Sequence, residues 1–152
     1  MYGMVFGKED YKYIAMADEL AKLTPCIRSK VGAVFVRSGK ILIKSYNGKI
    51  NDKVKVCDEL GGCIRVRDKI QHGHEMHKCF APCAETRCIC EAARDGIAIK
   101  GATVYCSHRP CLVCTRNLIA AEVEKVIYSI DYPDPDSALL AEKAGLPIVQ
   151  IK

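Results

Sequence analysis

The second half of the sequence alternates short runs rich in Val and Ile with amphipathic segments, and this alternation limits the possible folds more than any other feature. The apolar runs predict strands at 102–106, 123–130 and 148–151. Helices are predicted between them, at 110–121 and 136–144. A strand–helix–strand order favours parallel pairing with right-handed connections. We therefore expect the second half of the chain to build a parallel sheet.

The part of the sequence before residue 102 adds two strands and two helices. Apolar residues recur at helical spacing over 9–23, and the segment 85–94 predicts another helix. Two runs rich in Val and Ile, at 31–36 and 40–46, flank Ser38-Gly39 and predict a β-hairpin. A hairpin added to parallel strands gives a mixed sheet of about five strands. The predicted fold class is α/β, a three-layer α/β/α sandwich with helices on both faces of the sheet.

A long polar stretch from Asn47 to Pro82 interrupts this pattern, and several His and Cys residues gather near its end. A segment of that length without structure of its own is unusual inside a compact domain and needs an anchor. The chain has 152 residues, which is the size of one ordinary domain. We expect a single domain over 1–152, with a Cys/His-rich insert at about 50–82.

Ten cysteines are the unusual feature of the composition. The sequence begins without an export signal, so we expect a cytoplasmic protein with reduced thiols, in which metal binding or catalysis is favoured over disulfides. The longest apolar run is too short for a membrane span, so no membrane partner is expected. The formal charge of +5 suits an anionic ligand. The basic residues are spread out, however, so no nucleic-acid partner is expected.

The motif Pro110-Cys111-Leu112-Val113-Cys114 opens one of the predicted helices. Cysteines three apart lie on one face of a helix, and in its first turn the free N–H groups and the helix dipole favour thiolates. Two such sulfurs suit zinc. Two small buried side chains, or a redox-active pair, would produce the same spacing.

A second motif, Pro82-Cys83-Ala84-Glu85, opens another helix. Cys83 is a candidate third ligand, and Glu85 is a candidate carboxylate beside the metal. A spacing of two residues does not place both side chains on one helical face. Taken alone, the motif suits a structural cysteine and a favourable charge at a helix N-terminus. Three thiolates with an open fourth position would instead form a catalytic zinc site, which binds water and lowers its pKa.

Together, Cys83-Ala84-Glu85 and the Pro110–Cys114 motif resemble the signature of the zinc-dependent cytidine deaminase superfamily. Within it, the sequence is most similar to the deoxycytidylate (dCMP) deaminase branch. Five further segments are similar to blocks of that branch: Val31–Val34, Ser45–Gly48, Ala92–Gly96, Gly101–Tyr105 and Val126–Tyr128. The resemblance extends over about residues 9–150 and implies a cytidine deaminase-like fold.

The resemblance implies hydrolytic deamination of dCMP to dUMP and ammonia, a step of pyrimidine nucleotide metabolism. It implies zinc held by Cys83, Cys111 and Cys114. Glu85 matches the residue that passes a proton from water to N3 of the pyrimidine. The resemblance implies that Asn47 contacts the deoxyribose and that Tyr132 covers the base. It implies that Arg28, Ser29 and Lys30 contact the 5′-phosphate.

Three positions depart from the branch. It usually has His where Cys83 stands, Asn where Arg87 stands, and a Pro just after the Tyr-Asn-Gly block, where this chain has Lys49-Ile50. A cation at Arg87 would help to hold a phosphate or would change the substrate. Cytidine, deoxycytidine and CMP therefore stay open as substrates, as does a non-catalytic zinc module that recognises nucleic acid or protein. In the branch, the loop after Tyr-Asn-Gly also serves nucleotide effectors, but we do not expect such regulation for this chain.

The insert is similar to a Cys- and His-bearing insert found in many members of the branch, which implies a second, structural zinc. Its candidate ligands are Cys26, Cys57, Cys63 and Cys79, with His72, His74 or His77 as substitutes. The alternative is that these thiols are only packed and the histidines solvated. The other cysteines, Cys88, Cys90 and Cys106, are expected in the core. Oligomers are typical of this superfamily, so we expect a homo-oligomer that binds a cytosine nucleotide.

Overall fold

The sheet is mixed, as predicted. The structure is a computed structural model that describes residues 3–54 and 56–152. In this part of the chain, five strands pair in the order β2-β1-β3-β4-β5. β1 is antiparallel to both β2 and β3, whereas β3, β4 and β5 run parallel to one another. The strands are β1 (Gly32–Arg37), β2 (Lys40–Tyr46), β3 (Thr103–His108), β4 (Lys125–Ile130) and β5 (Ile148–Gln150).

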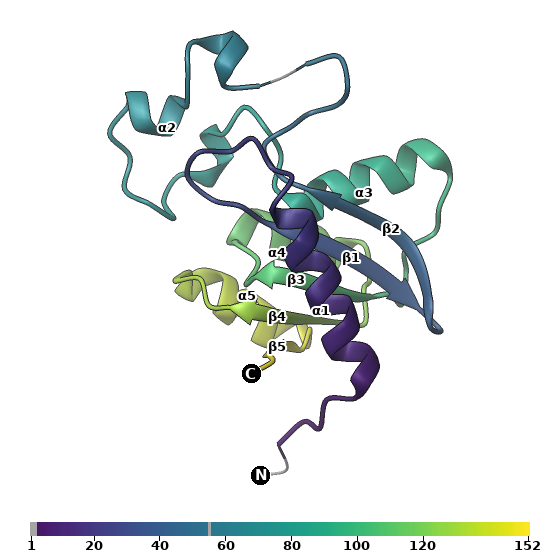
Figure 1. Ribbon diagram of the computed structural model, residues 1–152. Helices are drawn as coiled ribbons and strands as arrows, with labels where there is room; N and C mark the ends of the chain where they lie inside the picture. Colours follow the sequence, from purple (N-terminus) through teal and green to yellow (C-terminus); the bar gives the residue numbers. More distant parts are fainter. Residues whose placement is uncertain (1–2, 55) are drawn as a thin grey trace.

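Helices cover both faces of the sheet, which confirms the predicted three layers (Figure 1). One face is covered by α1, and the other by α3 and α4, with α5 packed beside α4. The four helices are α1 (Lys8–Ala21), α3 (Ala84–Asp95), α4 (Leu112–Ala120) and α5 (Pro135–Ala144). None of the described helices is both long enough and apolar enough to cross a lipid bilayer.

Alternate residues of β1 face the two helical layers. Val34 and Val36 pack in the cluster that contains α1, and Ala33 and Phe35 pack in the cluster that contains α3 and α4. Because both faces of this strand are covered, the run is apolar throughout and does not alternate with polar residues. β1 therefore contributes to both halves of the core.

The first helix is shorter than predicted. Its apolar spacing indicated 9–23, but the helix ends at Ala21, and Leu23 is 62% exposed. The buried face of α1 packs closely on β1, since a Cβ atom built on Gly32 would lie 2.1 Å from the carbonyl oxygen of Ala17. This backbone contact requires glycine, and it places the segment that leads into β1 directly beside the helix.

The insert between β2 and α3 forms a lobe at one end of the sheet (Figure 1). The sequence pattern predicted an irregular segment here. In the described residues it contains short elements, which are η1 (Asp58–Leu60), α2 (Ile64–Arg67) and η2 (Met76–Lys78). Elements this short have little core of their own, so the order of the lobe depends on what it packs against or binds.

Two of the three cysteines assigned to the core are there. Cys88 and Cys106 are buried, but Cys90 is exposed, so its prediction was wrong. Residues two apart on a helix point in different directions, and α3 turns only the Cys88 side toward the sheet.

Candidate active site and metal centre

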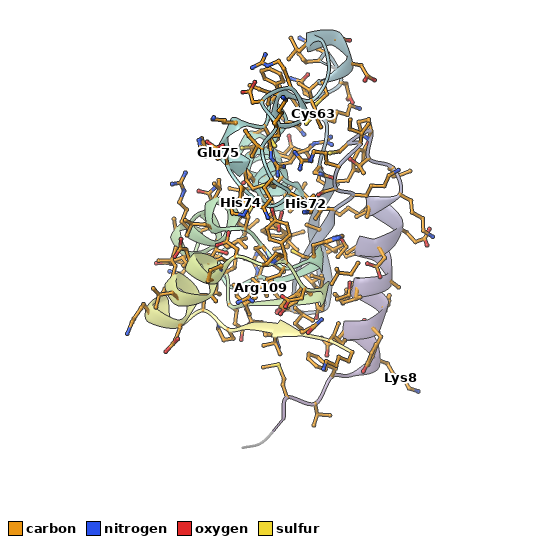
Figure 2. All side chains as sticks on the ribbon, turned by 90° about the vertical axis from the view of Figure 1, so that its left-hand side faces the viewer. Lys8, Cys63, His72, His74, Glu75 and Arg109 are labelled. Atoms are coloured by element: carbon orange, nitrogen blue, oxygen red, sulfur yellow. The ribbon has the colours of Figure 1, made fainter. Side chains whose placement is uncertain are left out.

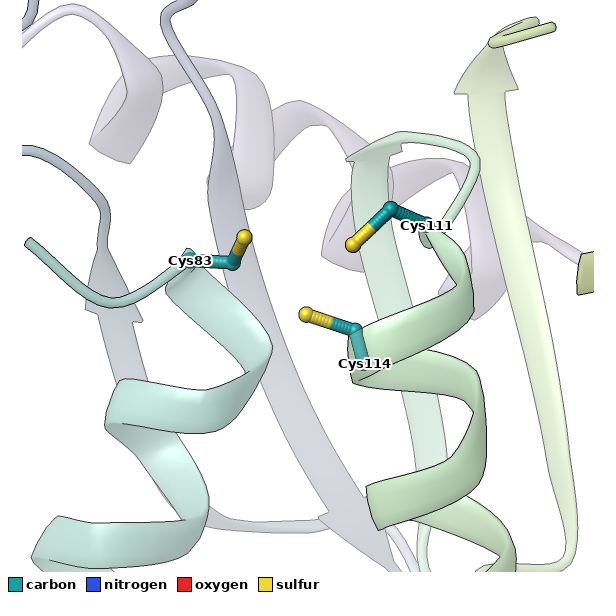
Figure 3. Close-up of side chains that lie close together, drawn as sticks. All are labelled: Cys83, Cys111 and Cys114. Carbon is teal, nitrogen blue, oxygen red and sulfur yellow. The ribbon is translucent and has the colours of Figure 1, made fainter. Parts of the chain in front are cut away.

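Three cysteines from the amino ends of two helices point toward one another (Figure 3). Cys83 is the N-cap residue of α3, Cys111 is the N-cap residue of α4, and Cys114 lies in the first turn of α4. Their sulfur atoms all lie within 4.8 Å of one another. Thiolates are ligands that zinc prefers, so this set of donors fits a zinc ion. The structure thus brings together the three residues that the sequence proposed.

A polar network holds the start of α4. The carboxylate of Asp134 accepts hydrogen bonds from the backbone N–H groups of Leu112 at 2.8 Å and Ser137 at 3.0 Å. The hydroxyl of Ser137 donates to the carbonyl oxygen of Pro110 at 2.9 Å and lies 2.7 Å from the hydroxyl of Thr115. One residue therefore caps both α4 and α5. Because these contacts fix the first turn of α4, they also fix the directions of its two cysteines.

The three thiols share their protons unequally. The S–H groups of Cys114 and Cys83 donate toward the sulfur of Cys111, which lowers the pKa of Cys111 to about 3. The same bonds raise the pKa of Cys83 and of Cys114, because they stabilise the protonated thiols. Zinc bound there would require all three thiols to be deprotonated, since metal ligands bind as thiolates.

Glu85 is buried beside this cluster. It is 3% exposed, and its Oε2 atom lies 3.5 Å from the sulfur of Cys114. Burial raises the pKa of Glu85 to about 7, and the nearby charge of Cys111 acts in the same direction. A carboxyl group with a pKa near neutrality can both accept and donate a proton during a reaction.

The helical spacing rule failed for Cys83 and Glu85 because Cys83 is not inside the helix. As the N-cap residue it has extended backbone angles, with φ −62° and ψ 161°. The rotation of about 100° per residue therefore does not apply between the two positions. Both side chains line the same cavity even though they are two residues apart.

A cavity of about 420 Å³ adjoins the three thiols and Glu85. Its walls come from the segment before β1, the end of β2, the insert, the end of β3 and the loop after β4. The sequence-predicted residues that line it, beyond the thiols and Glu85, are Ser29, Asn47 and Tyr132. The site therefore has a buried reactive floor and largely apolar walls with a few polar groups, which is the arrangement of a small-molecule binding cavity.

Four cavity residues were not among the site residues that the sequence predicted: Val31, Met76, His108 and Arg109. Figure 2 shows Arg109 below the insert, on the side where His72 and His74 project. His108 and Arg109 lie at the carboxyl end of β3, and ligands of α/β sheets gather at such ends. That position was the available signal for them. No pattern in the sequence distinguished Met76.

The comparisons with known proteins agree with this geometry. Residues 7–130 match the family described as the cytidine and deoxycytidylate deaminase zinc-binding region. The chain belongs to this family. The family match and the three-cysteine cluster together support a zinc site in this deaminase-family chain.

Two curated relatives show how far the similarity extends. ComE operon protein 2 of Bacillus subtilis is 31% identical over 141 residues, which are 92% of this chain and 69% of the relative. The deoxycytidylate deaminase of Schizosaccharomyces pombe is 31% identical over 142 residues, which are 93% of this chain. The match covers 43% of the yeast enzyme, so the chain spans less than half the length of that relative.

A solved structure gives the same fold. The dCMP deaminase of the cyanophage S-TIM5, in complex with dCMP and dUMP, has a TM-score of 0.78 and 24% sequence identity. The match covers 97% of this chain and 100% of the phage chain. The cytidine deaminase-like fold implied by the sequence is therefore confirmed.

Within this deaminase-family chain, Asn47 organises one wall of the cavity. Its Oδ1 accepts from the N–H of Val31 at 3.0 Å, and its Nδ2 donates to the carbonyl oxygen of Ser29 at 2.8 Å. Its own carbonyl oxygen accepts from the hydroxyl of Thr24 at 2.7 Å. Gly48 follows with φ +80°, and a Cβ atom there would lie 2.5 Å from the same hydroxyl oxygen. The turn therefore requires glycine, and the sugar contact of Asn47 stays a prediction.

Tyr132 lines the cavity from the loop after β4. It is 8% exposed, and its ring packs edge-on against His72 with the ring centroids 6.2 Å apart. Burial raises the pKa of Tyr132 to about 12, so the phenol is neutral at physiological pH. Its hydroxyl has no hydrogen-bond partner among the described residues. Coverage of the base by this ring stays a prediction.

Arg28 and Lys30 lie in different surroundings. Arg28 lines a neighbouring cavity, and its Nη1 donates to the carbonyl oxygen of Ile70 in the insert at 3.0 Å. Lys30 is exposed and is not among the residues that line either cavity. Their contacts with a phosphate stay predictions, and the structure adds that Arg28 ties the insert to the segment before β1.

Arg87 does not line the cavity of the three thiols. Its Nε donates to Oε1 of Glu91 at 2.8 Å, and its Nη1 donates to the carbonyl oxygen of Tyr46 at 3.1 Å. The guanidinium also lies 4.9 Å from the centre of the Tyr46 ring. The side chain that replaces the family's asparagine therefore holds the end of β2, next to Asn47.

The four cysteines proposed for a second zinc gather around the neighbouring cavity, of about 500 Å³. The four cysteines that line this cavity are Cys26, Cys57, Cys63 and Cys79. Among the described residues, no three of their sulfurs meet the 4.8 Å limit that the first cluster meets. None of the three insert histidines lines this cavity, and His74 and His77 line a surface depression near the start of α5. The structure therefore favours the thiols over the histidines as a group.

Proposed function

We propose that the chain catalyses the hydrolytic deamination of dCMP to dUMP with release of ammonia. The observation that carries this proposal is Glu85, buried beside three thiols that suit zinc, in one cavity. A purely structural zinc site has no need of a buried carboxyl group beside it. Support comes from the relatives, since the yeast relative is named deoxycytidylate deaminase and the phage structure contains dCMP and dUMP.

In the proposed reaction, the three cysteines bind the metal and Glu85 transfers protons. Cys83, Cys111 and Cys114 would hold the zinc as its three protein ligands. Zinc bound there supplies Lewis acidity, which makes water nucleophilic near neutral pH. Glu85 accepts a proton from the attacking water and delivers it to N3 of cytosine, while the water oxygen bonds to C4. The second water proton passes through Glu85 to the amino nitrogen. The C4–N4 bond then breaks, and ammonia leaves.

The cavity walls suit a nucleotide. We propose that Asn47 lies along the sugar and that Tyr132 covers the base. Of the predicted phosphate contacts, Ser29 lines both cavities and Arg28 lines the adjoining one, and Arg109 is a basic residue in the wall of the thiol cavity itself. The test is the relative kcat/KM for dCMP, CMP, deoxycytidine and cytidine, with zinc measured on the same sample. We expect dCMP to be preferred, and inactivity on all four compounds would defeat the proposal.

A non-catalytic zinc module remains the competing function, because the chain is basic and rich in cysteine. A gel-shift assay with single-stranded DNA and RNA separates the two. Tight, salt-sensitive binding in a sample without deaminase activity would favour the module. We expect no such binding.

We also propose a second, structural zinc held by Cys26, Cys57, Cys63 and Cys79. Their position around one cavity at the base of the insert supports this ligand set. The short elements of the insert have little core, so a closed four-ligand site would supply the anchor that this segment needs.

We expect two zinc ions per chain in the wild-type protein and one in Cys63→Ser. The serine removes one ligand of the second site and leaves the three thiols of the first site in place. Metal content by mass spectrometry checks this, and digestion with a protease follows the order of the insert. Cys90→Ser is the matched control, because Cys90 is an exposed thiol on α3. Two zinc ions in Cys63→Ser, or one in the wild type, would contradict the second site.

Arg87→Ala is expected to raise KM for dCMP by about 10-fold, which is the effect of losing one hydrogen bond from a charged group. The loss frees the carbonyl of Tyr46, and the neighbouring Asn47 then holds its wall less firmly. Zinc content stays unchanged. Arg94→Ala is the control, since Arg94 is exposed on the same helix and pairs with Asp95.

The same variant separates positioning from phosphate binding. A positioning role predicts an equal rise in KM for dCMP and for deoxycytidine, which lacks the phosphate. An increase confined to dCMP would instead assign Arg87 to the phosphate and contradict the positioning role.

We propose that residues 1–152 form one deaminase domain whose insert is part of its active-site wall, since Met76 of the insert lines the cavity. We further propose a homo-oligomer that works in the cytoplasm, where thiol ligands stay reduced. Size-exclusion chromatography with light scattering tests the oligomer.

A further inference from the structure

A buried arginine in the insert has no carboxylate partner in the part of the chain that the structure describes. Arg65, on the short helix α2, is 3% exposed. Its Nε donates to the carbonyl oxygen of His74 at 3.1 Å, and its Nη1 approaches the sulfur of Cys79 at 3.6 Å. Its Nη2 is buried and has no hydrogen-bond partner among the described residues. One face of this guanidinium is therefore left without an acceptor.

The other arginine of α2 shows the contrast. Arg67 is exposed and pairs with the carboxylate of Asp68 at 2.8 Å. Ion pairs of the described arginines involve Arg67, Arg87, Arg94 and Arg109, and none involves Arg65. Arginine stays charged at every pH that a folded protein survives, so Arg65 cannot escape the cost of burial by losing its proton. A buried charge of this kind requires an anion next to it.

The cavity beside Arg65 supplies candidate anions. Arg65 lines the same cavity as Cys26, Cys57, Cys63 and Cys79. Figure 2 labels Cys63 in the insert, near the top of that view and away from Arg109. Four neutral thiols do not balance the guanidinium, but four thiolates around one Zn²⁺ carry a net charge of −2. A cation at the edge of such a centre lowers its charge, and its N–H groups can bond to the sulfurs.

We propose that Arg65 is the built-in counter-charge of a four-thiolate zinc centre, with its guanidinium bonded to Cys79 and its second amino group facing the other thiolates. This inference rests on the second zinc put forward under the proposed function. Arg65 acts through the ligands and not on substrate, so it is a positioning residue. Its contact with Cys79 also selects Cys79 as the fourth ligand over His77, which does not line the cavity.

A substrate phosphate is the other anion within reach. The cavity of Arg65 and the cavity of Glu85 share Ser29, Asn47, Met76 and Cys83, so the two spaces adjoin. The Cys79 contact and the hydrogen bond to His74 favour the thiol centre, because both orient the guanidinium within the insert. The experiment below separates the two anions.

Arg65→Met, which keeps most of the side-chain length and removes the charge, is compared with Arg67→Met on the same helix. Zinc per chain and the affinity of each zinc are measured by competition with a chromophoric chelator. The wild type and Arg67→Met should hold two zinc ions. Arg65→Met should keep one tightly and bind the second about 10- to 100-fold more weakly, which is the usual effect of losing a partner of metal ligands.

A second readout counts the thiolates directly. Cobalt(II) substituted into the second site gives a sulfur-to-metal charge-transfer band whose intensity grows with the number of thiolates. We expect a four-thiolate band in the wild type that weakens in Arg65→Met. Arg65→Lys keeps the charge and should hold the second zinc within a few-fold of wild type. If Arg65→Met does not fold, Arg65→Gln is the neutral variant, with the same expectation as Arg65→Met.

The outcomes are distinguishable. One zinc in the wild type contradicts the second site itself, and the Arg65 inference falls with it. Two zinc ions of unchanged affinity in the neutral Arg65 variants overturn the counter-charge alone and leave the second site in place. A third outcome is a neutral Arg65 variant that binds two zinc ions with wild-type affinity but has a raised KM for dCMP and not for deoxycytidine. This result would show that Arg65 binds the substrate phosphate, and it would also overturn the inference.

Discussion

Glu85→Gln is expected to lower kcat for dCMP by about 100- to 10,000-fold and to leave the zinc content unchanged. Glutamine keeps the size of the side chain but can neither accept the proton of water nor deliver it to N3, and proton transfer by a positioned side chain contributes on this order. KM should change little, because the carboxyl group lies at the floor of the cavity, beside Cys114. Ammonia release and zinc content on one sample check the prediction.

The control for this variant is Glu142→Gln on α5, because Glu142 is exposed and lines neither the cavity of the three thiols nor the neighbouring one. The control should keep the wild-type rate. A Glu85→Gln protein that retains a tenth or more of the activity, with zinc bound, would remove Glu85 from the reaction. Loss of zinc in the variant would instead show that Glu85 acts on the metal site and not on the proton.

The order of strands and helices was readable from the sequence because each element depends on local patterns. The parallel second half follows from its strand–helix alternation, and the hairpin follows from Ser38-Gly39. The placement of β1 between β2 and β3 was not readable, since it depends on which faces of the hairpin the helices cover. The end of α1 was misplaced by two residues because Leu23, although apolar, lies past the contact with Gly32.

The site was readable where its residues belong to one motif, and less so where they meet only in space. Cys111 and Cys114 follow from their helical spacing, but helix geometry could not connect Cys83 with Glu85, because an N-cap residue lies outside the helix. Arg109 enters the cavity from the end of a strand, and Met76 enters it from the insert. No sequence spacing predicts that such residues line the cavity, since tertiary contacts alone bring them there.

The role of Arg87 shows the limit of reasoning from residue type. A cation in place of the family's asparagine suggested a phosphate contact or a changed substrate. In the structure its donors are used by Glu91 and by the carbonyl of Tyr46, so its charge serves the wall of the cavity. Arg65, by contrast, was unremarked in the sequence and emerges only from its burial.

Cys114→Ala is expected to remove the catalytic zinc and with it all measurable deaminase activity. Cys114 is fully buried between Cys83, Cys111 and Glu85, so no water or neighbouring side chain replaces its sulfur. Partners of metal ligands contribute about 10- to 100-fold to affinity, and loss of a ligand itself should exceed this range. Zinc content should fall from two ions to one per chain, and activity should not return when zinc is added at stoichiometric amounts.

Cys88→Ala is the matched control, because Cys88 is also a fully buried cysteine on a helix that packs against the sheet. It loses the same sulfur atom from the core, and among the described residues the one polar contact of its thiol is with the carbonyl of Ala33, at 3.8 Å. Both variants should therefore lose similar stability from packing, and only Cys114→Ala should lose zinc. If Cys114→Ala retained two tightly bound zinc ions, or turned over dCMP at a rate near that of Cys88→Ala, the three thiols would not be the centre of the reaction.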